Sequence, residues 1–154
     1  MSKEQDLIRV REFAEHSKAL YMRKANLRGA DLSKLDLNCA YLLEANLESA
    51  NMRQVKLRNA DLTRANLKSA NLYYANLVRA TLEDACLGAA NLKHAQLDFA
   101  DLRGADLRAA TLEWATLRRA DLRGADLLDA DLRMAWIETA DLEGARMPDG
   151  TIHR

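Results

Sequence analysis

The chain has 154 residues, the length of one domain or of one run of repeats. Its apolar residues are mostly Ala and Leu, with only two Phe and two Trp, so a core built from them must be narrow and regular. The 23 Lys/Arg balance the 23 Asp/Glu, which argues against a uniformly basic nucleic-acid binder and against a strongly acidic mimic of DNA.

The charged N-terminal residues contain no stretch of signal-peptide or membrane-span length. Cys39 and Cys86 lack metal-ligand spacing, so we expect a cytoplasmic protein with reduced thiols.

Residues 1–19 are predicted to form a short N-terminal capping helix. Ser2 and Gln5 have the spacing of a capping box, in which each side chain accepts a hydrogen bond from the other residue's backbone N–H. The apolar face expected on one side of this helix consists of Leu7, Ile8, Val10, Phe13 and Ala14.

Residues 20–149 repeat with a period of five. Ala recurs at every fifth position from Ala25 to Ala145, except at Leu35 and Val55, and Leu, Met or Ile stands two residues after each. Five residues fit neither one face of a helix nor one face of a continuous strand. The pattern is satisfied if each Ala-x-Leu forms a short straight edge and the next two residues turn a corner. Repeated corners bending the same way close the chain into a stacked coil.

The corner residues support this interpretation. Gly, Asn and Asp, which tolerate the positive φ that a type II turn requires at its third residue, occupy the second corner position at several repeats. These residues are Gly29, Asn59, Asp84, Gly104, Gly124, Asp129 and Gly144. Pro148 takes a first corner position, where its fixed φ suits a turn, and residues 150–154 are expected to form a C-terminal tail.

The units Ala25-Asn26-Leu27, Ala60-Asp61-Leu62 and Ala130-Asp131-Leu132 follow the pattern A-[D/N]-L-x-x, and on these units the chain resembles the pentapeptide-repeat proteins. The resemblance implies an all-β solenoid, a right-handed quadrilateral β-helix with twenty residues per coil. The 25 repeats from Ala25 then make about six coils beneath the N-terminal helix. The ending MPDGTIHR resembles the C-termini of many cyanobacterial members. Leu35 and Val55 would stack near the first end, where their bulk either fills space beneath the helix or reflects simple drift.

Twenty residues per coil would place aromatic and arginine side chains on neighbouring columns at two corners. We expect a candidate protein-binding surface there, because Tyr, Trp and Arg are the types that anchor interfaces. The candidate residues are Arg53, Tyr73, Tyr74, Arg79, His94, Phe99, Trp114, Arg119 and Met134. The competing interpretation is that these rings only stabilise the surface, since cross-strand pairs contribute about 0.2–1 kcal/mol each.

A filled rod offers neither a pocket nor converging titratable groups, so no enzyme activity, catalytic residue, cofactor or metal is expected. We expect a non-enzymatic scaffold or regulator whose partner is a protein, not a nucleic acid or a membrane. Residues 1–80 carry a net charge of +5 and residues 81–154 a net charge of −5, so the chain should be a monomer or a weak homodimer formed end to end or antiparallel. Cys39 and Cys86 fall in different columns, so no disulfide is expected between them.

The alternative implied by the resemblance is a DNA-mimicking modulator of DNA gyrase or topoisomerase, of the quinolone-resistance type. That branch resembles B-DNA through an acidic rod, a frequent Phe at the central position and a dimer joined through C-terminal coils. Here no central position holds Phe, and Arg is abundant in the C-terminal coils. A third possibility is that the rod only spaces or stabilises a partner.

Overall fold

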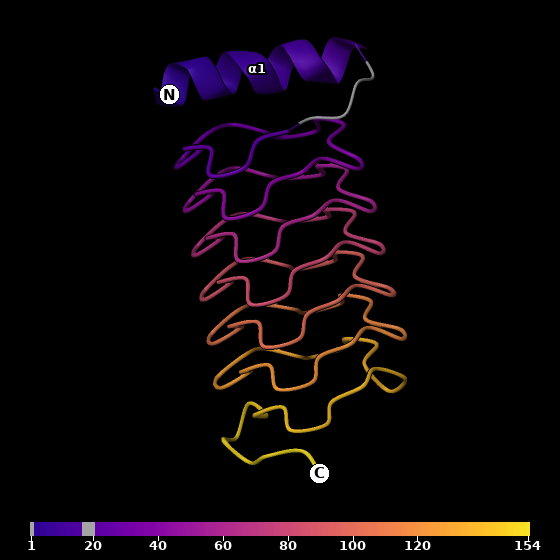
Figure 1. Cartoon of the computed structure of the whole chain (residues 1–154). Coiled ribbons are helices and arrows are strands. Elements are labelled where there is room, and N and C mark those ends of the chain that lie inside the picture. Colours follow the sequence, from indigo (N-terminus) through magenta and orange to yellow (C-terminus); the bar gives the residue numbers. More distant parts are fainter. Residues whose placement is uncertain (1, 17–20) are drawn as a thin grey trace.

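The N-terminal helix begins at the residue that its capping box predicts. The computed structural model describes residues 2–16 and 21–154, and within the helix it describes side chains as far as Glu12. Helix α1 spans Lys3–His16. Ser2 Oγ accepts a hydrogen bond from the Gln5 N–H at 3.3 Å, and Gln5 Oε1 accepts one from the Ser2 N–H at 3.1 Å. Figure 1 shows α1 lying across one end of a stack of coils, with the C-terminus at the other end.

Beyond residue 20 the chain winds into coils that advance by twenty residues. Every parallel β-bridge joins a residue to the one twenty positions later, from Tyr21–Tyr41 to Asp126–Arg146. Bridges recur at every fifth residue, so each coil has four sides. Each predicted edge is present, but it contributes only one bridge residue between two turns. The described residues therefore contain isolated β-bridges, and none of them forms a strand of several residues.

We name the four sides A to D in chain order by their bridge residues, and each two-residue corner by the side that it follows. Side A holds Tyr21, Tyr41, Asp61, Thr81, Asp101, Asp121 and Asp141; side B holds Asn26, Asn46, Asn66, Cys86, Asp106, Asp126 and Arg146. Side C holds Asp31, Asn51, Asn71, Asn91, Thr111 and Asp131; side D holds Asp36, Lys56, Asn76, Gln96, Thr116 and Trp136. The corner residues stand two and three positions after each bridge residue.

The corners have the backbone geometry that their sequence predicts. Each is closed by a hydrogen bond from the Ala N–H to the Leu carbonyl three residues earlier, as in Ala75 to Leu72 at 2.9 Å. The second corner residue has a positive φ at every corner from Lys24 to Gly144 except at Thr139, and its φ lies between 54° at Ala109 and 70° at Gly144. This conformation is not confined to Gly, Asn and Asp: Trp114 adopts it with φ 61°. The fold therefore imposes the turn on side chains that do not favour it.

Leucine and alanine fill the interior, as predicted. The leucines from Leu27 to Leu127 are buried, apart from Leu35 and the corner residue Leu43, and Met52 and Val55 are buried in the same columns. Burying one such side chain contributes about 1.5–3 kcal/mol. Backbone hydrogen bonds link successive coils, for example from Leu72 N–H to the Asn91 carbonyl at 2.8 Å. Leu35 is only partly buried, and the role of Leu35 and Val55 beneath the helix stays a prediction.

Helix α1 packs on the first coil through fewer apolar side chains than the sequence suggested. Val10 is buried in the core cluster and Leu7 packs against it. Ile8 is 50% exposed, so its place in the predicted apolar face is wrong. Neighbouring helical residues point about 100° apart, and a helix that presents Leu7 to the coil turns Ile8 away from it. Phe13 and Ala14 lie outside the described side chains.

Two polar side chains of α1 bind backbone groups of the first coil. Asp6 is 2% exposed, and its Oδ2 accepts a hydrogen bond from the Asn26 N–H at 2.9 Å. Arg9 Nη2 donates to the Tyr21 carbonyl at 2.8 Å. One coil later, equivalent groups bond to backbone: the Asn46 N–H donates to Ala25 and the Tyr41 carbonyl accepts from Met22. Asp6 and Arg9 therefore occupy the places that a preceding coil would take.

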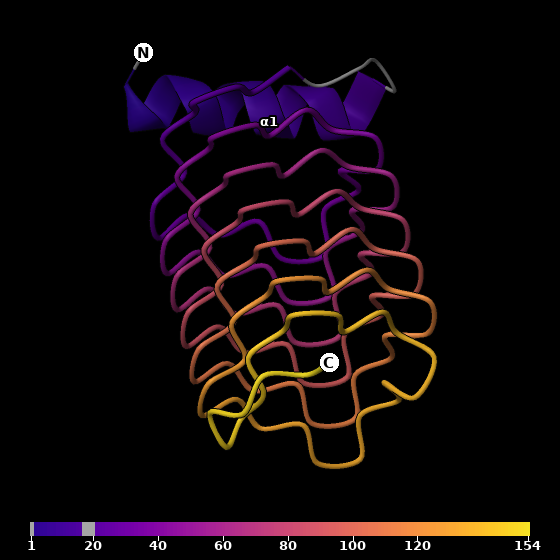
Figure 2. The same ribbon diagram turned by 60° about the horizontal axis from the view of Figure 1, so that its bottom comes forward.

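At the other end the predicted tail reverses and pairs with the last coil. Arg146 and Ile152 form an antiparallel bridge, and the His153 N–H donates to the Ala145 carbonyl at 2.8 Å. Pro148 takes its predicted corner position, but the positive φ moves to Gly150, at 84°. That shift turns the chain back on itself. Figure 2 brings this end of the stack forward.

The tail closes only one side of this end. In the part of the chain that the structure describes, the backbone N–H groups of Leu132, Ile137 and Leu142 donate to no backbone carbonyl. Their side chains are partly buried, whereas the equivalent leucines of the preceding coils are fully buried. The C-terminal end is thus an open β edge on sides C, D and A.

Candidate functional site

The coil brings the predicted aromatic residues of corner C into one continuous stack. Tyr74 and His94 lie parallel with ring centroids 4.6 Å apart, and His94 and Trp114 lie nearly parallel at 6.3 Å. Met134 follows one coil below and is exposed. Tyr74 and Trp114 are 48% and 45% exposed. Because the rings stack on one another, they present their edges to solvent, including the polar atoms of Tyr, His and Trp.

The first corner residues extend this surface sideways. Tyr73 meets Tyr74 edge to face at 4.6 Å, and the Arg53 guanidinium lies 4.5 Å from the centre of the Tyr73 ring. Further along the same column, Lys93 Nζ binds Glu113 Oε2 at 2.8 Å. The bond to Glu113 raises the pKa of Lys93, and the bond to Lys93 lowers the pKa of Glu113.

Corner D holds the second group of predicted residues. Phe99 is 47% exposed and lies between two arginines, with the Arg79 and Arg119 guanidinium carbons 5.7 and 5.9 Å from its ring centre. The three residues stand at successive second corner positions, with φ of 59°, 60° and 56°. Such cation–π contacts contribute about 0.5–1 kcal/mol at exposed sites.

Two further residues beside Phe99 belong to this surface and were missed from the sequence. Arg118 lies 5.4 Å from the ring centre of Trp136, which is 52% exposed. Arg118 also makes a bidentate bond to Asp98, with Nη2–Oδ2 2.8 Å and Nε–Oδ1 3.2 Å. Burial raises the pKa of the Asp98 carboxyl, but the Arg118 side-chain and backbone bonds outweigh it and the pKa lies below its ordinary value. Arg118 and Trp136 are eighteen residues apart and meet diagonally between successive coils. The sequence alignment of columns paired only residues twenty apart and therefore did not bring them together.

Side D with corners C and D is the part of the coils that carries excess positive charge. Its nine basic residues are Lys34, Arg53, Lys56, Arg58, Arg79, Lys93, Arg118, Arg119 and Arg133. Its four acidic residues are Asp36, Asp98, Glu113 and Glu138. The net charge is therefore +5 on this side, which we call the aromatic–arginine surface, while sides A and C contain only acidic charges. This transverse asymmetry adds to the longitudinal one expected from the sequence.

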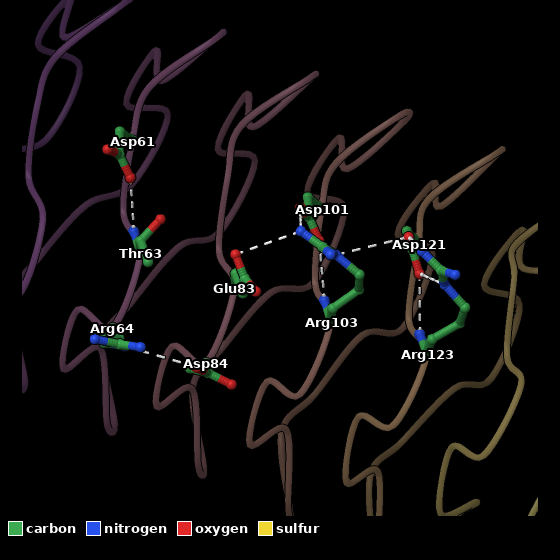
Figure 3. Close-up of polar contacts among 9 residues, drawn as sticks. All are labelled: Asp61, Thr63, Arg64, Glu83, Asp84, Asp101, Arg103, Asp121 and Arg123. Atoms are coloured by element: carbon green, nitrogen blue, oxygen red, sulfur yellow. Dashed lines mark hydrogen bonds and ion pairs between the residues drawn. The ribbon is translucent and has the colours of Figure 1, made fainter.

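The arginines next to side A are used differently, as Figure 3 shows. Arg103 Nε and Nη2 donate to the two oxygens of Asp101 at 2.8 and 2.7 Å, and Arg123 binds Asp121 in the same way. Arg103 also lies 3.3 Å from Glu83 and 3.8 Å from Asp121. The Arg103 bonds hold the pKa of Asp101 below its ordinary value, against the opposing effect of burial. The stacked aspartates are therefore neutralised by their own arginines, as an exposed structural ladder.

The second corner positions differ in size around the coil. Corners A and B hold Gly29, Gly104, Gly124 and Gly144, along with Ser and Ala at several coils. Corners C and D hold no glycine, and Tyr74, His94, Phe99 and Trp114 stand there with positive φ. A left-handed conformation costs an L-residue about 1–2 kcal/mol. Corner A also places Lys24, Glu44 and Arg64 at this position, but aromatic residues occupy it only at corners C and D, where glycine would relieve the strain.

A hollow of about 400 Å³ lies at side B and corner B. It is lined in part by Lys68, Cys86, Gly88, Asp106 and Arg108. The Cys86 thiol lies 3.9 Å from Asp106, and Cys86 and Cys39 are both free thiols, as expected. Neither a group of metal-ligating side chains nor a helix long and apolar enough to cross a membrane is found in the ranges that the structure describes.

Comparisons with solved structures find repeat proteins of the same kind. The chain is similar to HetL, a pentapeptide repeat protein involved in heterocyst differentiation regulation in the cyanobacterium Nostoc sp. strain PCC 7120, with 31% identity over 86% of this chain and 78% of that chain and a TM-score of 0.49. A pentapeptide repeat protein of the Arabidopsis thaliana thylakoid lumen is 25% identical over 83% of this chain and 72% of that chain, with a TM-score of 0.48. The plasmid-mediated fluoroquinolone resistance protein QnrB1 is 17% identical over 85% of this chain and 84% of that chain, with a TM-score of 0.37.

The sequence itself carries the family signature. The comparison with curated proteins finds no match. The family model for pentapeptide repeats matches in eight copies, over residues 25–64, 45–84, 85–124 and 105–144. These matches cover more than half of the chain and coincide with the four-sided coils. The chain therefore belongs to the pentapeptide repeat family, whose members form right-handed quadrilateral β-helices.

Proposed function

We propose that this chain is a non-enzymatic scaffold or regulator of the cytoplasm that binds a protein partner through the aromatic–arginine surface. The observation that carries the proposal is the half-exposed stack of Tyr74, His94 and Trp114 beside the Arg79–Phe99–Arg119 group. Aromatic and arginine side chains of this kind dominate the energy of protein interfaces. The rings also keep a backbone conformation that glycine would adopt without strain, which a purely structural corner does not require.

The competing interpretation is that stacking only stabilises the corner. Stacked rings on a β surface contribute about 0.2–1 kcal/mol per pair, which offsets part of the cost of the left-handed backbone. The distribution of residue types favours the binding role, because corners A and B form the same turn with Gly, Ser, Ala, Asp, Lys, Glu and Arg and with no aromatic residue. The fold therefore does not need rings at this position.

Affinity capture with purified variants tests the proposal. Tyr74→Asn combined with Trp114→Asn removes both rings while keeping a residue that tolerates positive φ. We expect the double variant to lose partners that the wild-type chain captures from the lysate of its own organism, as measured by quantitative mass spectrometry. Ala89→Asn combined with Ala109→Asn is the matched control, because it changes the same turn position at corner B. Unchanged capture together with a lowered melting temperature would favour the structural interpretation.

We also infer that residues 1–19 act as an end cap for about six coils formed by residues 20–149. The support is chemical: Asp6 and Arg9 satisfy a backbone N–H and a carbonyl that would otherwise face solvent, and Val10 covers the first core layer. Val10→Asp tests this inference, because a charge in the buried contact should detach α1. Aggregation or a clear loss of melting temperature is expected, and an unchanged melting temperature would contradict the cap.

The gyrase-modulator alternative receives less support. A mimic of DNA needs an uncompensated acidic surface, whereas Asp101, Asp106 and Asp121 each bind an arginine through two hydrogen bonds. A supercoiling assay with purified gyrase, with and without a fluoroquinolone, tests it directly. Neither inhibition nor protection is expected.

A further inference from the structure

Eight arginines of the coils differ in what holds the guanidinium, and Arg118 alone among these eight contacts both a carboxylate and a ring. Five of them form bidentate bonds to aspartate: Arg103, Arg108, Arg118, Arg123 and Arg133. Arg53, Arg79 and Arg119 instead lie against the rings of Tyr73 and Phe99. Considering the described residues alone, no carboxylate oxygen lies within 4.0 Å of these three guanidinium groups. We call them the ring-held arginines.

A ring holds an arginine without using its hydrogen-bond donors. Contact with the Tyr73 or Phe99 ring restricts the guanidinium, and this contact takes up none of its N–H donors in a bond to a carboxylate. A carboxylate, in contrast, uses two of those donors, as Asp101 does with Arg103. The ring-held arginines are therefore partly ordered in advance and still able to form bidentate bonds to an incoming carboxylate.

The backbone fixes the spacing of two of them. Arg79 and Arg119 stand two coils apart, and the intervening hydrogen bonds run from Arg79 N–H to the Asp98 carbonyl and from Phe99 N–H to the Arg118 carbonyl, at 3.0 and 2.9 Å. Two strand spacings separate them by about 10 Å along the rod. An extended chain reaches the same distance in about three residues. In an extended segment of the polyproline II type, with three residues per turn, acidic residues three apart also lie on one face and therefore match the pair.

Charge and apolar contacts point to a protein as the source of those carboxylates. The aromatic–arginine surface carries a net charge of +5 and includes the exposed side chains of Trp114, Met134 and Trp136, which suit apolar protein side chains. A nucleic acid gains affinity from many phosphate contacts in a row, typically about six to ten. The three ring-held arginines offer fewer contacts than such a row requires.

We propose that Arg53, Arg79 and Arg119 bind carboxylates of an acidic, extended segment of the protein partner, whose apolar residues contact Trp114 and Met134. This inference rests on the proposed function and adds the chemistry of the partner. It makes the aromatic rings positioning elements for the arginines as well as contact surfaces. It also assigns different roles to arginines that the repeat pattern treats alike.

Fluorescence anisotropy with a defined probe tests it. The probe is a fluorescein-labelled peptide of about 12 residues with glutamate at every third position and leucine, alanine and serine between, chosen to reach about 10 Å between carboxylates. We expect binding at low ionic strength that weakens with added salt, because exposed charges are screened over about 10 Å at 0.1 M. Arg79→Gln with Arg119→Gln should weaken binding about tenfold. A peptide with glutamine in place of glutamate should not bind.

The matched control is Arg103→Gln with Arg123→Gln, which removes the same charge from arginines that are already bound to aspartate. We expect it to change the affinity by about twofold or less, through long-range charge alone. Circular dichroism and thermal melting verify that both double variants are folded. No binding of the glutamate peptide, or equal effects of the two double variants, would overturn the proposal. Tighter binding of an oligothymidine of equal length through Arg79 and Arg119 would overturn it in favour of nucleic acid.

The same variants separate this inference from the function on which it rests. If the Tyr74→Asn and Trp114→Asn variant loses the captured partner while the Arg79→Gln and Arg119→Gln variant retains it at every salt concentration, the surface binds a protein but not through acidic groups. If both variants retain the partner, the proposed function itself is wrong. Loss in both, with the salt dependence of the peptide, supports the two proposals together.

Discussion

Corners A and D have the same backbone turn and both carry arginines, but the arginines make different contacts at the two corners. At corner A, Arg103 and Arg123 are engaged by aspartates of their own coil and of neighbouring coils, so their charge and donors are satisfied within the protein (Figure 3). At corner D, Arg79 and Arg119 enclose Phe99 and have no carboxylate partner in the described part of the chain. The difference shows that one regular repeat can form a side whose arginines are paired within the protein and a side whose arginines have free hydrogen-bond donors.

The largest expected effect is the loss of stability in acid, through the aspartates that bind arginines. Hydrogen bonds from arginine lower the pKa values of Asp101, Asp106, Asp121 and Asp131 relative to the unfolded chain. Stabilisation from a lowered pKa is present above the unfolded value near 4 and is lost as the pH falls through the folded value. We expect a melting temperature that is level from about pH 8 to pH 5 and drops steeply below about pH 4.

Variants sharpen this pH comparison. Asp101→Asn with Asp121→Asn should make the acid limb shallower, because two of the titrating groups are gone. Arg79→Gln with Arg119→Gln should leave the limb unchanged, because no carboxylate binds those arginines. Melting curves across the pH series decide the matter, and a limb altered equally by both pairs would contradict the distinction between the two corners.

The next largest effect is expected at Asp98, where corner D does use a carboxylate. Asp98 is 7% exposed and accepts hydrogen bonds from the Arg118 backbone and side chain. Asp98→Ala leaves these donors unpaired next to the core, so we expect the free energy of unfolding to fall by about 1–3 kcal/mol. Urea denaturation measures it. Asp131→Ala, at an exposed pair, serves as the control and should cost clearly less.

A smaller change is expected when the ring of corner D is removed. Phe99→Asn deletes the contacts to Arg79 and Arg119 but suits the positive φ of 60°. The free energy of unfolding should fall by about 0.5–1 kcal/mol. Affinity for the glutamate peptide should fall as well, because the arginines lose their support. Retained affinity would mean that the ring does not position them.

The smallest effect on stability is expected at corner C. Trp114→Gly removes a stacking contact of about 0.2–1 kcal/mol and at the same time relieves a left-handed backbone that costs about 1–2 kcal/mol. These terms nearly cancel, so the melting temperature should change little while partner capture is lost. A large destabilisation would show that the stack is needed for folding.

The sequence predicted the coil because its determinants repeat. A period of five, with Ala and Leu two residues apart and turn-forming residues at the second corner position, leaves few ways to bury the leucines, and Leu27 to Leu127 are buried as expected. The columns at corners C and D followed from the twenty-residue coil. Their contacts, such as Tyr74 on His94, needed only the vertical alignment that bridges impose.

What could not be predicted lies where the repeat stops or where side-chain direction decides. The helix has no period in common with the coils, so the outward turn of Ile8 and the bond from Asp6 to the Asn26 N–H had no signal in the pattern. The tail reverses at Gly150, one residue later than a regular corner. Arg118 meets Trp136 diagonally because a long arginine reaches beyond its own row.

The uncovered edge at Leu132, Ile137 and Leu142 sets a direction for opening of the molecule. Each coil is held mainly by its nearest neighbours, so a coil with a neighbour on one side only is the weakest unit of the array. Amide hydrogens of the last coil on sides C, D and A should exchange with deuterium first, and protection should rise coil by coil toward α1. Local unfolding should therefore begin at the C-terminal coil and proceed toward α1.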